Sequence, residues 1–355
     1  MSVRRVQPVA GVGASRAYAG PPATTAGTVK LDANEGPRLP AGLQEVLAGI
    51  DLERARCYPK VGALTRSLAD LVGVGPERVL VTAGGDEALE RICRVMLEPG
   101  RDAIATTPTF EMIPRYVRAT GAALTEVPWF GGEFPTERVI ERVTGQTAAI
   151  FVVTPNNPTG GVASERDLVR LAEAAPGALL VVDLAYTEFA DVDLTPAALA
   201  IPNAIVVRTL SKAWGLAGLR VGWAAGSEEL IGWLASAGNP YSVSGVSAAI
   251  AEAWLERGAP AMRAGVDRVR LERADLSTRL RSSGARVLES QGNFVLAGFA
   301  GASSVHERLL VEGVSVRKFA SAELEGWLRI TCPGDAGDFE RLTRALASAM
   351  KGVSA

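Results

Sequence analysis

One lysine stands where it could act as a nucleophile. Lys212 closes the segment Thr209-Leu210-Ser211-Lys212, which follows an apolar run. A lysine amine attacks a carbonyl and forms a Schiff base when apolar surroundings or nearby cations disfavour its charge. A lone lysine after a strand is more often a surface charge. Several other polar segments of the chain, described next, favour the nucleophile.

A carboxylate and an amide follow two further apolar runs. Asp183 ends the run Leu179–Asp183. A charge at the end of a buried strand is costly unless it is paired, so Asp183 needs a partner of opposite charge. Asn157 lies in Asn156-Asn157-Pro158-Thr159-Gly160, where turn residues fix the backbone around the amide. We expect both side chains to serve a bound group, although a simple loop asparagine is the alternative for Asn157.

The segment Thr82–Glu87 predicts an anion site. It offers a strand, a Gly-Gly turn and a helix N-terminus in that order, and the backbone N–H groups of Gly85 and Asp86 would face the anion. Gly-Gly before a helix is by itself often only a turn. The side chains of Thr209, Ser211 and Arg220 would complete a phosphate cup. Arg220 could make a bidentate contact with the phosphate.

Two arginines predict where an anionic substrate would bind. Arg317 and Arg329 lie twelve positions apart on two expected strands. Each could be a surface charge, but the pair favours an anionic substrate. Because a guanidinium fork binds carboxylate and phosphate alike, the pair does not choose the anion.

Composition and missing motifs exclude several classes of function. The 355 residues include 37 basic and 39 acidic side chains without a run of one sign, so neither nucleic acid nor a membrane surface is an expected partner. The only histidine, His306, makes a Ser-His-Asp hydrolase or a multi-histidine metal site hard to assemble, and we expect no metal. Gly11-Val12-Gly13 lacks the third glycine of a dinucleotide-binding loop. Three scattered cysteines and the lack of an apolar leader predict a cytoplasmic protein.

Alternating apolar runs and amphipathic stretches position these residues. Runs without polar alternation are typical of strands buried on both faces, so we expect a three-layer αβα large domain with a mainly parallel central sheet. Helices are expected at Glu87–Leu97 and after Ser164, where Ser164-Glu165-Arg166-Asp167 has the form of a capping box. The expected strands are Val79–Thr82, Ala103–Thr106, Ala148–Val153, Leu179–Asp183, Ala204–Thr209 and Val221–Ala225.

A smaller α+β domain is expected after a long charged helix at Ala259–Ser283. Its short strands are expected at Arg286–Leu288, Asn293–Leu296, Val314–Arg317 and Trp327–Thr331, and its helices at Ser304–Glu312 and Gly337–Met350. The predicted organisation is an N-terminal arm with part of the small domain (1–45), a large cofactor-binding domain (46–240), and the connecting helix with the rest of the small domain (241–355).

Together these segments resemble the fold-type I pyridoxal-phosphate aminotransferases, and most closely the histidinol-phosphate aminotransferase family. The resemblance extends from Leu31-Asp32-Ala33-Asn34-Glu35 to Leu328-Arg329-Ile330-Thr331. It implies an aspartate-aminotransferase-like fold and the cofactor pyridoxal 5'-phosphate. It gives Lys212 the roles of holding the cofactor and moving the proton at the substrate Cα. It also implies that Asp183 keeps the ring nitrogen protonated, while Asn157 and Tyr186 hydrogen-bond the phenolic oxygen.

The resemblance assigns further residues to the cofactor and the substrate. Phe110 would stack on the pyridine ring, and Tyr58 would reach the phosphate in the partner subunit, which implies a homodimer. Tyr18 would close over the substrate. In relatives the arginine matching Arg329 anchors a carboxylate, whereas histidinol-phosphate enzymes use both Arg317 and Arg329 on the substrate phosphate. Small anionic amines and oxo acids are therefore the expected substrates.

The function expected from the resemblance is transamination between histidinol phosphate and 2-oxoglutarate, a step of histidine biosynthesis. One alternative on the same scaffold is an aminotransferase for an aromatic or other biosynthetic amino acid, and another is a decarboxylase or an oxidase. A cofactor-sensing regulator is an alternative of a different class. It would need a DNA-binding module, and only about thirty residues precede Leu31, which is too few for one.

Overall fold

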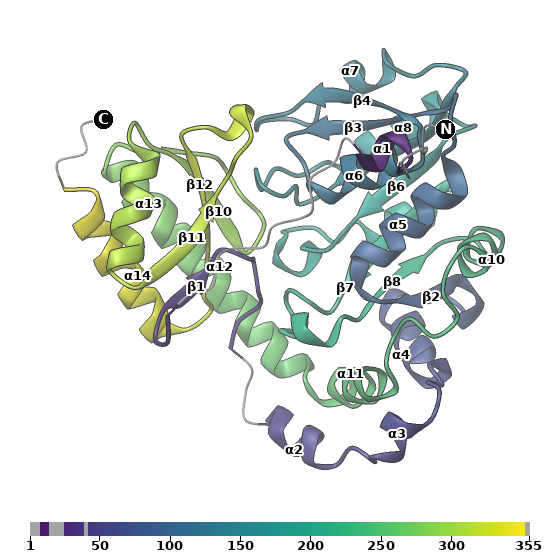
Figure 1. The fold of residues 1–355 in the computed structure, drawn as a ribbon, viewed down its shortest axis with the longest axis horizontal. Coiled ribbons are helices and arrows are strands. Elements are labelled where there is room, and N and C mark those ends of the chain that lie inside the picture. Colours follow the sequence, from purple (N-terminus) through teal and green to yellow (C-terminus); the bar gives the residue numbers. More distant parts are fainter. Residues whose placement is uncertain (1–7, 14–24, 39–41, 352–355) are drawn as a thin grey trace, which may run out of the picture.

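The computed structural model describes residues 8–13, 25–38 and 42–351 and places most strands in a seven-stranded sheet (Figure 1). The strand order is β2-β8-β7-β6-β5-β3-β4. The strands are β2 (Val79–Thr82), β3 (Asp102–Thr107), β4 (Ala123–Pro128), β5 (Thr147–Val153), β6 (Leu179–Asp183), β7 (Ala204–Thr209) and β8 (Gly222–Ala225). The six expected strands all form, within one residue of the predicted bounds.

Two features of this sheet differ from the sequence pattern. β8 runs antiparallel to both of its neighbours, β2 and β7, whereas the central strands are parallel. Apolar periodicity carries no information on strand direction, so the reversal could not be read from the run 221–225. β4 was not expected, because it is an edge strand whose side chains are largely exposed or half-buried rather than continuously apolar.

Helices cover both faces of the large sheet. One face packs against α5 (Gly84–Met96), α6 (Met112–Ala119) and α10 (Glu228–Ser236), and the other against α7 (Thr136–Ile140), α8 (Glu165–Ala174) and α9 (Thr195–Leu199). The capping box before α8 is confirmed, since the Ser164 hydroxyl accepts from the Asp167 N–H and the Asp167 carboxylate accepts from the Ser164 N–H. The remaining helices of this part are α1 (Ala10–Gly13), α2 (Gly42–Ala48), α3 (Glu53–Arg56), α4 (Gly62–Val72) and α11 (Gly245–Arg257).

A second sheet of five strands forms the small domain, with the order β1-β11-β12-β10-β9. Its strands are β1 (Val29–Leu31), β9 (Arg286–Val287), β10 (Phe294–Gly298), β11 (Val314–Lys318) and β12 (Trp327–Thr331). The long helix α12 (Ala259–Ser282) packs on it together with α13 (Ala302–Val311) and α14 (Ala336–Ala349). β1 pairs with β11 in parallel, so the N-terminal segment is part of this sheet.

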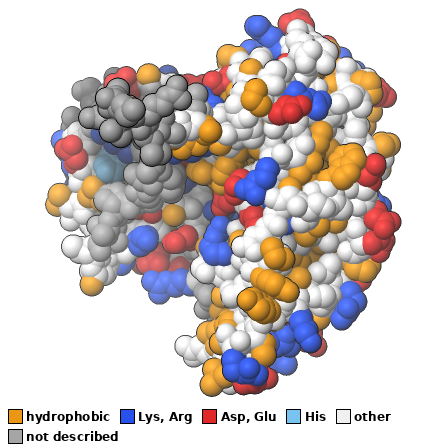
Figure 2. Space-filling model, turned by 45° about the vertical axis from the view of Figure 1, so that its right-hand side comes forward, with side chains coloured by type: hydrophobic (Ala, Val, Ile, Leu, Met, Phe, Trp, Pro, Cys, Tyr) orange, Lys and Arg blue, Asp and Glu red, His pale blue; other side chains and the backbone are white. Residues whose placement is uncertain are grey.

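The visible face of the molecule does not favour a partner that carries charge of a single sign. Figure 2 shows side chains of both signs interspersed over the visible face, with apolar side chains between them. Within the described part of the chain, no helix is long and apolar enough to cross a membrane.

Candidate active site

The polar segments singled out above meet between the two sheets. Parallel strands present their carboxyl ends at one edge of a sheet, which is where open α/β sheets bind ligands. The loops after β5 and β7 carry Asn157 and Lys212 to this edge, where Asp183 is the last residue of β6, and β12 brings Arg329 to the same place. The segment that follows β1 completes the site by contacting Lys212.

Lys212 is half-buried and held by backbone carbonyls. Its Nζ donates to the oxygens of Asn34, at 2.9 Å, and Ala33, at 3.4 Å. The same Nζ lies 5.5 Å from the centre of the Tyr186 ring. Among the described residues, its hydrogen-bond partners are thus neutral backbone carbonyls.

Asn34 is a member of this site that sequence reasoning did not assign. It is buried, donates through Nδ2 to the Tyr186 hydroxyl at 3.1 Å, and accepts at Oδ1 from the Thr331 hydroxyl at 2.8 Å. Its φ of 52° and the φ of 53° at Arg220 are the two positive values among described non-glycine residues. Such backbone costs energy and tends to be kept at functional sites. No sequence pattern reveals it, although Asn34 lies in a segment that carried the family resemblance.

Asp183 is a buried carboxylate with little to balance its charge. Burial raises its pKa to about 6, opposed by a hydrogen bond from the Ala185 N–H at 3.0 Å and by the positive charge of Lys212. The Ala185 N–H is the one hydrogen-bond donor that the described residues provide. The carboxylate can therefore accept from a cationic N–H of a bound group.

The residues predicted to bind a phosphate lie together around the start of α5. The helix begins at Gly84, so the N–H groups of Gly85 and Asp86 lie in its first turn and have no acceptor within the helix. The Thr209 and Ser211 hydroxyls lie 2.8 Å apart, and both side chains are buried. Arg220 donates to the Asp86 carboxylate at 2.8 Å. The Asp86 side chain thus holds Arg220 over this helix N-terminus.

The two arginines that were predicted to bind substrate lie opposite each other on neighbouring strands. Arg317 on β11 pairs in register with Arg329 on β12, so both side chains project from the same face of the sheet. Arg329 is buried and donates to the Asn157 amide oxygen at 2.6 Å and to the Asp32 carbonyl at 2.8 Å. Arg317 forms an ion pair with Glu111 at 3.0 Å. The fold therefore brings a loop of the large domain to an arginine of the small domain.

The remaining residues predicted for the site are Phe110, Tyr58 and Tyr18. Phe110 follows β3, is half-buried and packs against the core beneath α5 and α6. Asn156, which was not assigned a role, ties this loop to the one after β5, because its buried amide bonds the Pro108 carbonyl at 2.9 Å and the Thr109 hydroxyl at 3.0 Å. Tyr58 is 77% exposed and stacks on Tyr241. Tyr18 lies outside the described residues.

This fold and site define a class of protein. A mainly parallel seven-stranded sheet, a smaller domain facing its carboxyl edge and a lysine between them are the architecture of pyridoxal-phosphate enzymes with the aspartate-aminotransferase-like fold. Within the described ranges, no group of three or more His, Cys, Asp or Glu side chains could hold a metal ion.

Comparisons with known proteins specify the family. The model of aminotransferase class I and II matches residues 27–346. Histidinol-phosphate aminotransferase of Caldanaerobacter subterraneus subsp. tengcongensis is 36% identical over 324 residues, which cover 87% of this chain and 90% of that protein. The enzyme of the same name from Salmonella typhimurium is 36% identical over 314 residues, 86% of each chain. This chain belongs to the aminotransferase class I and II family.

Solved structures agree with the fold. Histidinol-phosphate aminotransferase from Sinorhizobium meliloti, determined with pyridoxal 5'-phosphate, superposes with a TM-score of 0.83 over 92% of each chain at 24% identity. A double mutant of Thermus thermophilus aspartate aminotransferase gives a TM-score of 0.76 over 91% of each chain at 26% identity. The chain is thus a pyridoxal-phosphate-dependent aminotransferase with an aspartate-aminotransferase-like fold.

The described residues fit this cofactor. The unbalanced Asp183 carboxylate suits a protonated ring nitrogen, and the first turn of α5 suits a phosphate. The turn before α5 can keep its position only if residue 222 has no side chain. A Cβ at Gly222 would lie 2.4 Å from the carbonyl carbon of Gly84 and 2.5 Å from the nitrogen of Gly85. β8 can therefore pass directly behind the turn that begins α5.

This close approach predicts the effect of Gly222→Ala. The added methyl group must displace the turn, and overpacking of this kind costs roughly 1–3 kcal/mol. We expect the dissociation constant for pyridoxal phosphate to rise by about tenfold and the melting temperature to fall. Equilibrium dialysis and thermal unfolding measure these two quantities. Gly218→Ala, in the short 3₁₀-helix just before β8, is the matched control, because a Cβ there meets no atom within 4 Å. Equal cofactor affinity in both variants would contradict the role given to Gly222.

Proposed function

We propose that this aminotransferase transfers the amino group of histidinol phosphate to 2-oxoglutarate. The observation that carries the proposal is the register of Arg317 with Arg329 on neighbouring strands. Like charges directly opposite each other destabilise a sheet, and a doubly charged phosphate between the two guanidinium groups would relieve their repulsion. The names of the 36% identical relatives support the same substrate.

The two arginines differ in how they are held. Arg329 is buried, and its hydrogen bonds to Asn157 and Asp32 fix its position before substrate arrives. Arg317 is only partly buried, and its partner Glu111 is exposed, so this ion pair exchanges readily for a contact with phosphate. Arg329 therefore provides the fixed part of the anion site and Arg317 the adjustable part.

The remaining residues take the following proposed roles. When bound, pyridoxal phosphate supplies a carbonyl and an electron-withdrawing ring that stabilises negative charge at the substrate Cα. Lys212 holds the cofactor and carries the proton to and from this carbon. Asp183 keeps the ring nitrogen protonated, and Tyr186 and Asn157 donate hydrogen bonds to the phenolic oxygen while Phe110 stacks on the ring. The proposed phosphate contacts are Gly85, Asp86, Thr209, Ser211 and Arg220.

Lys212 and Tyr186 already contact the same neighbour. The amine of Lys212 and the hydroxyl of Tyr186 both hydrogen-bond Asn34, through its carbonyl oxygen and its side-chain amide respectively. Asn34 therefore keeps both groups next to each other on the side of the site facing the small domain. We propose that the carbonyls of Ala33 and Asn34 accept hydrogen bonds from the amine whenever it is not attached to the cofactor.

We propose that the active unit is a homodimer in which Tyr58 reaches the cofactor phosphate of the partner subunit. The Tyr58 ring projects outward, and its described ring contact is with Tyr241 rather than with the site of its own chain. Leu47 and Leu52, on the same N-terminal segment, are also exposed. A dimer contact at this segment would cover these exposed apolar side chains.

The half-reaction tests the substrate. Purified protein loaded with pyridoxal phosphate is mixed with L-histidinol phosphate without an oxo acid, and the released oxo phosphate is counted. We expect one equivalent per cofactor and no further turnover until 2-oxoglutarate is added. No release with histidinol phosphate, together with release from aspartate or phenylalanine, would overturn the proposed substrate and retain the aminotransferase.

The arginine pair predicts a defect that depends on the substrate phosphate. Hydrogen bonds to charged groups contribute about 1.5–3 kcal/mol, so Arg317→Gln should raise the KM for histidinol phosphate by roughly 10- to 100-fold. L-histidinol, which lacks the phosphate, should react at an unchanged rate. Steady-state kinetics with both amines measure the ratio, and Arg344→Gln on the exposed surface of α14 is the control. Equal losses with both amines would show that Arg317 does not bind the phosphate.

A further inference from the structure

Two exposed aromatic rings lie face to face on the surface of the large domain. The ring centres of Tyr58 and Tyr241 are 4.6 Å apart with an angle of 22° between the planes. Tyr58 is 77% exposed and Tyr241 52% exposed. They come from the segment after α3 and from the loop before α11, which lie together at one end of the molecule (Figure 1). Exposed tyrosine side chains rarely hold one orientation unless a neighbour restrains them.

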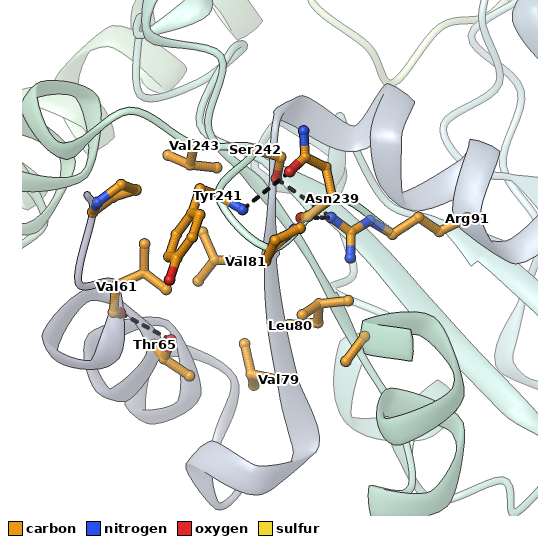
Figure 3. Close-up of a pocket in the computed structure, with 13 residues that line it drawn as sticks. Val61, Thr65, Val79, Leu80, Val81, Arg91, Asn239, Tyr241, Ser242 and Val243 are labelled. Carbon is orange, nitrogen blue, oxygen red and sulfur yellow. Dashed lines mark hydrogen bonds between the residues drawn. The ribbon is translucent and has the colours of Figure 1, made fainter. Parts of the chain in front are cut away.

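The Tyr241 ring borders a pocket rather than a packed core. Figure 3 shows this pocket, of about 190 Å³, between the ring, Val61 and the side chains of β2. Because one side of the Tyr241 ring faces this space, core side chains do not fix the orientation of the ring. Its position depends on the Tyr58 stack and on the loop that carries it.

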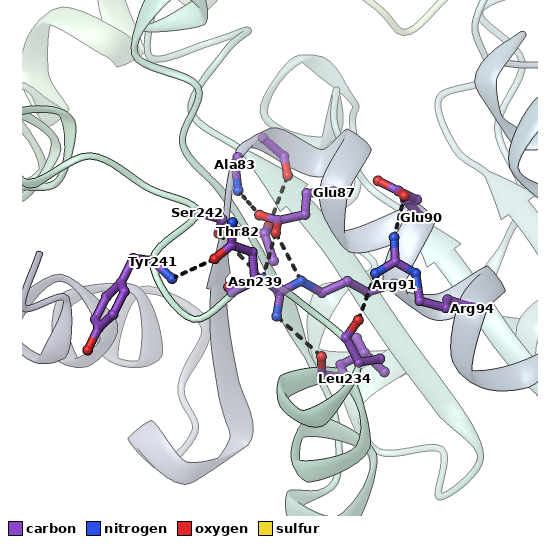
Figure 4. A network of polar contacts seen from close by, with 12 residues as sticks. Thr82, Ala83, Glu87, Glu90, Arg91, Arg94, Leu234, Asn239, Tyr241 and Ser242 are labelled. Atoms are coloured by element: carbon purple, nitrogen blue, oxygen red, sulfur yellow. Dashed lines mark hydrogen bonds and ion pairs between the residues drawn. The ribbon is translucent and has the colours of Figure 1, made fainter. Parts of the chain in front are cut away.

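Arg91 anchors that loop. The guanidinium of this buried residue donates to the Asn239 carbonyl at 2.9 Å, to the Ser242 hydroxyl at 3.4 Å and to the Leu234 carbonyl at 3.3 Å (Figure 4). Gly238 allows this packing, since a Cβ there would lie 1.8 Å from the guanidinium carbon. Arg91 therefore fixes the loop preceding α11 at Asn239 and Ser242, the two residues that flank Pro240 and Tyr241.

The same arginine is linked to the phosphate-binding turn. Arg91 forms an ion pair with Glu87 at 2.6 Å, and the other oxygen of Glu87 accepts from the Ala83 N–H at 2.5 Å (Figure 4). Burial alone would raise the pKa of Glu87, but the hydrogen bonds from Ala83, Ser242 and Arg91 outweigh it and hold the pKa below its usual value. Glu87 is thus a carboxylate that ties the start of α5 to the loop bearing Tyr241.

We propose that Tyr241 is a positioning residue that orients Tyr58 toward the cofactor phosphate of the partner subunit. This inference rests on the proposed dimer, in which Tyr58 acts across the interface. Tyr241 supplies a flat surface that limits the Tyr58 ring to one orientation, and Arg91 fixes Tyr241. In each subunit the Arg91–Glu87 ion pair thus joins two segments. One is the turn at that subunit's own phosphate site, and the other is the loop that orients Tyr58 toward the phosphate of the partner subunit.

A double-mutant cycle tests whether Tyr241 acts through Tyr58. Holoenzymes of Tyr241→Leu, Tyr58→Leu and the double variant are dialysed, and the dissociation constants of pyridoxal phosphate and of pyridoxal are measured. We expect Tyr241→Leu to weaken pyridoxal phosphate binding roughly two- to tenfold, the range that one aromatic stack contributes, and to leave pyridoxal binding unchanged. In the Tyr58→Leu background the second substitution should have no further effect. Tyr241→Phe, which retains the stack, should bind as the wild type does.

Hybrid dimers test whether the effect crosses the interface. A differently tagged Lys212→Ala subunit is paired with a Tyr241→Leu subunit. The site that retains Lys212 then receives both tyrosines from the other chain, so its affinity for pyridoxal phosphate should equal that of the wild type. An affinity that remains as low as in the Tyr241→Leu homodimer would overturn the proposal. Trp233→Leu, another exposed aromatic that is 46% exposed on α10, is the control and should change neither affinity.

The outcomes separate this inference from the proposed dimer. If Tyr58→Leu weakens pyridoxal phosphate binding and Tyr241→Leu does not, the dimer role of Tyr58 stands and the positioning role of Tyr241 is wrong. If Tyr58→Leu has no effect on the ratio of the two dissociation constants, both are wrong. Arg91→Lys, which retains the charge beside Glu87 but loses the fork that bonds the loop, should reproduce part of the Tyr241→Leu defect.

Discussion

Lys212→Ala should lower the rate of transamination by at least about 10⁴-fold, because it removes the amine that we propose both holds the cofactor and moves the proton. The structure supports both roles, since the amine is half-buried and its described hydrogen-bond partners are the backbone carbonyls of Ala33 and Asn34. The variant should still bind pyridoxal phosphate, because the donors at the start of α5 do not depend on the lysine. Single-turnover kinetics and dialysis measure these two properties separately.

Two further measurements make the Lys212 prediction specific. Borohydride reduction of the wild-type holoenzyme, followed by digestion and mass spectrometry, should place the mass of the cofactor on the peptide containing Lys212. Lys351→Ala, which removes an exposed lysine next to the end of α14, should leave the rate unchanged. A substantial rate in Lys212→Ala, or cofactor mass on another lysine, would disprove the assignment.

Asp183→Asn should lower the rate by roughly 10²- to 10³-fold, the second-largest effect expected. Breaking a buried ion pair by removing one partner costs about 3–5 kcal/mol, and the pair here would consist of Asp183 and the protonated ring nitrogen. An asparagine occupies nearly the same volume and still accepts from the Ala185 N–H, so the fold should not change. The substitution removes only the negative charge that we propose keeps the ring nitrogen protonated.

The same substitution should stabilise the protein when the cofactor is absent. Burial raises the pKa of Asp183 from 3.8 to about 6. Between these values the unfolded chain ionises before the folded chain does, so the folded state loses stability as the pH rises. Above pH 6 the loss is complete and amounts to on the order of 3 kcal/mol, at about 1.4 kcal/mol for each pKa unit. The asparagine side chain of the variant cannot ionise and avoids this loss.

Urea unfolding of both cofactor-free proteins between pH 5 and pH 8 tests this reasoning. The advantage of Asp183→Asn over the wild type should grow from pH 5 to about pH 6 and then stay constant. With saturating pyridoxal phosphate the order should reverse, because only the wild type gains the ion pair with the ring nitrogen. A stability advantage that does not vary with pH would show that the Asp183 carboxyl is not the titrating group.

The sequence predicted the buried strands and the capped helices well, because these depend on local patterns. The uninterrupted apolar run at Leu179–Val182 can only be satisfied by burial on both faces, and the Ser164 capping box is complete within four residues. The antiparallel direction of β8 and the edge strand β4 were beyond such patterns. Strand direction depends on the connections between strands, and an edge strand needs no continuous apolar run.

The residues of the candidate site likewise divide into those that the sequence could identify and those that it could not. Lys212, Asp183 and Asn157 could be singled out because each lies at or shortly after the end of an apolar run and has a side chain suited to chemistry or to binding. Asn34 could not, because its role depends on a positive φ and on contacts with Tyr186 and Thr331, which are distant in sequence. The pairing of Arg317 with Arg329 depends on the register of two strands, and the stack of Tyr58 on Tyr241 joins residues far apart along the chain.

By itself, then, the sequence determined which residue types could do the chemistry and which local elements carry them, because periodicity, capping and turn residues act over a few positions. Only the tertiary structure decided which of these residues share a site. The contact of Asn34 with Lys212 and that of Arg329 with Asn157 each join the two sheets across more than a hundred residues. Such contacts are fixed by how the sheets pack, and packing minimises exposed apolar surface over the whole chain rather than within any one segment.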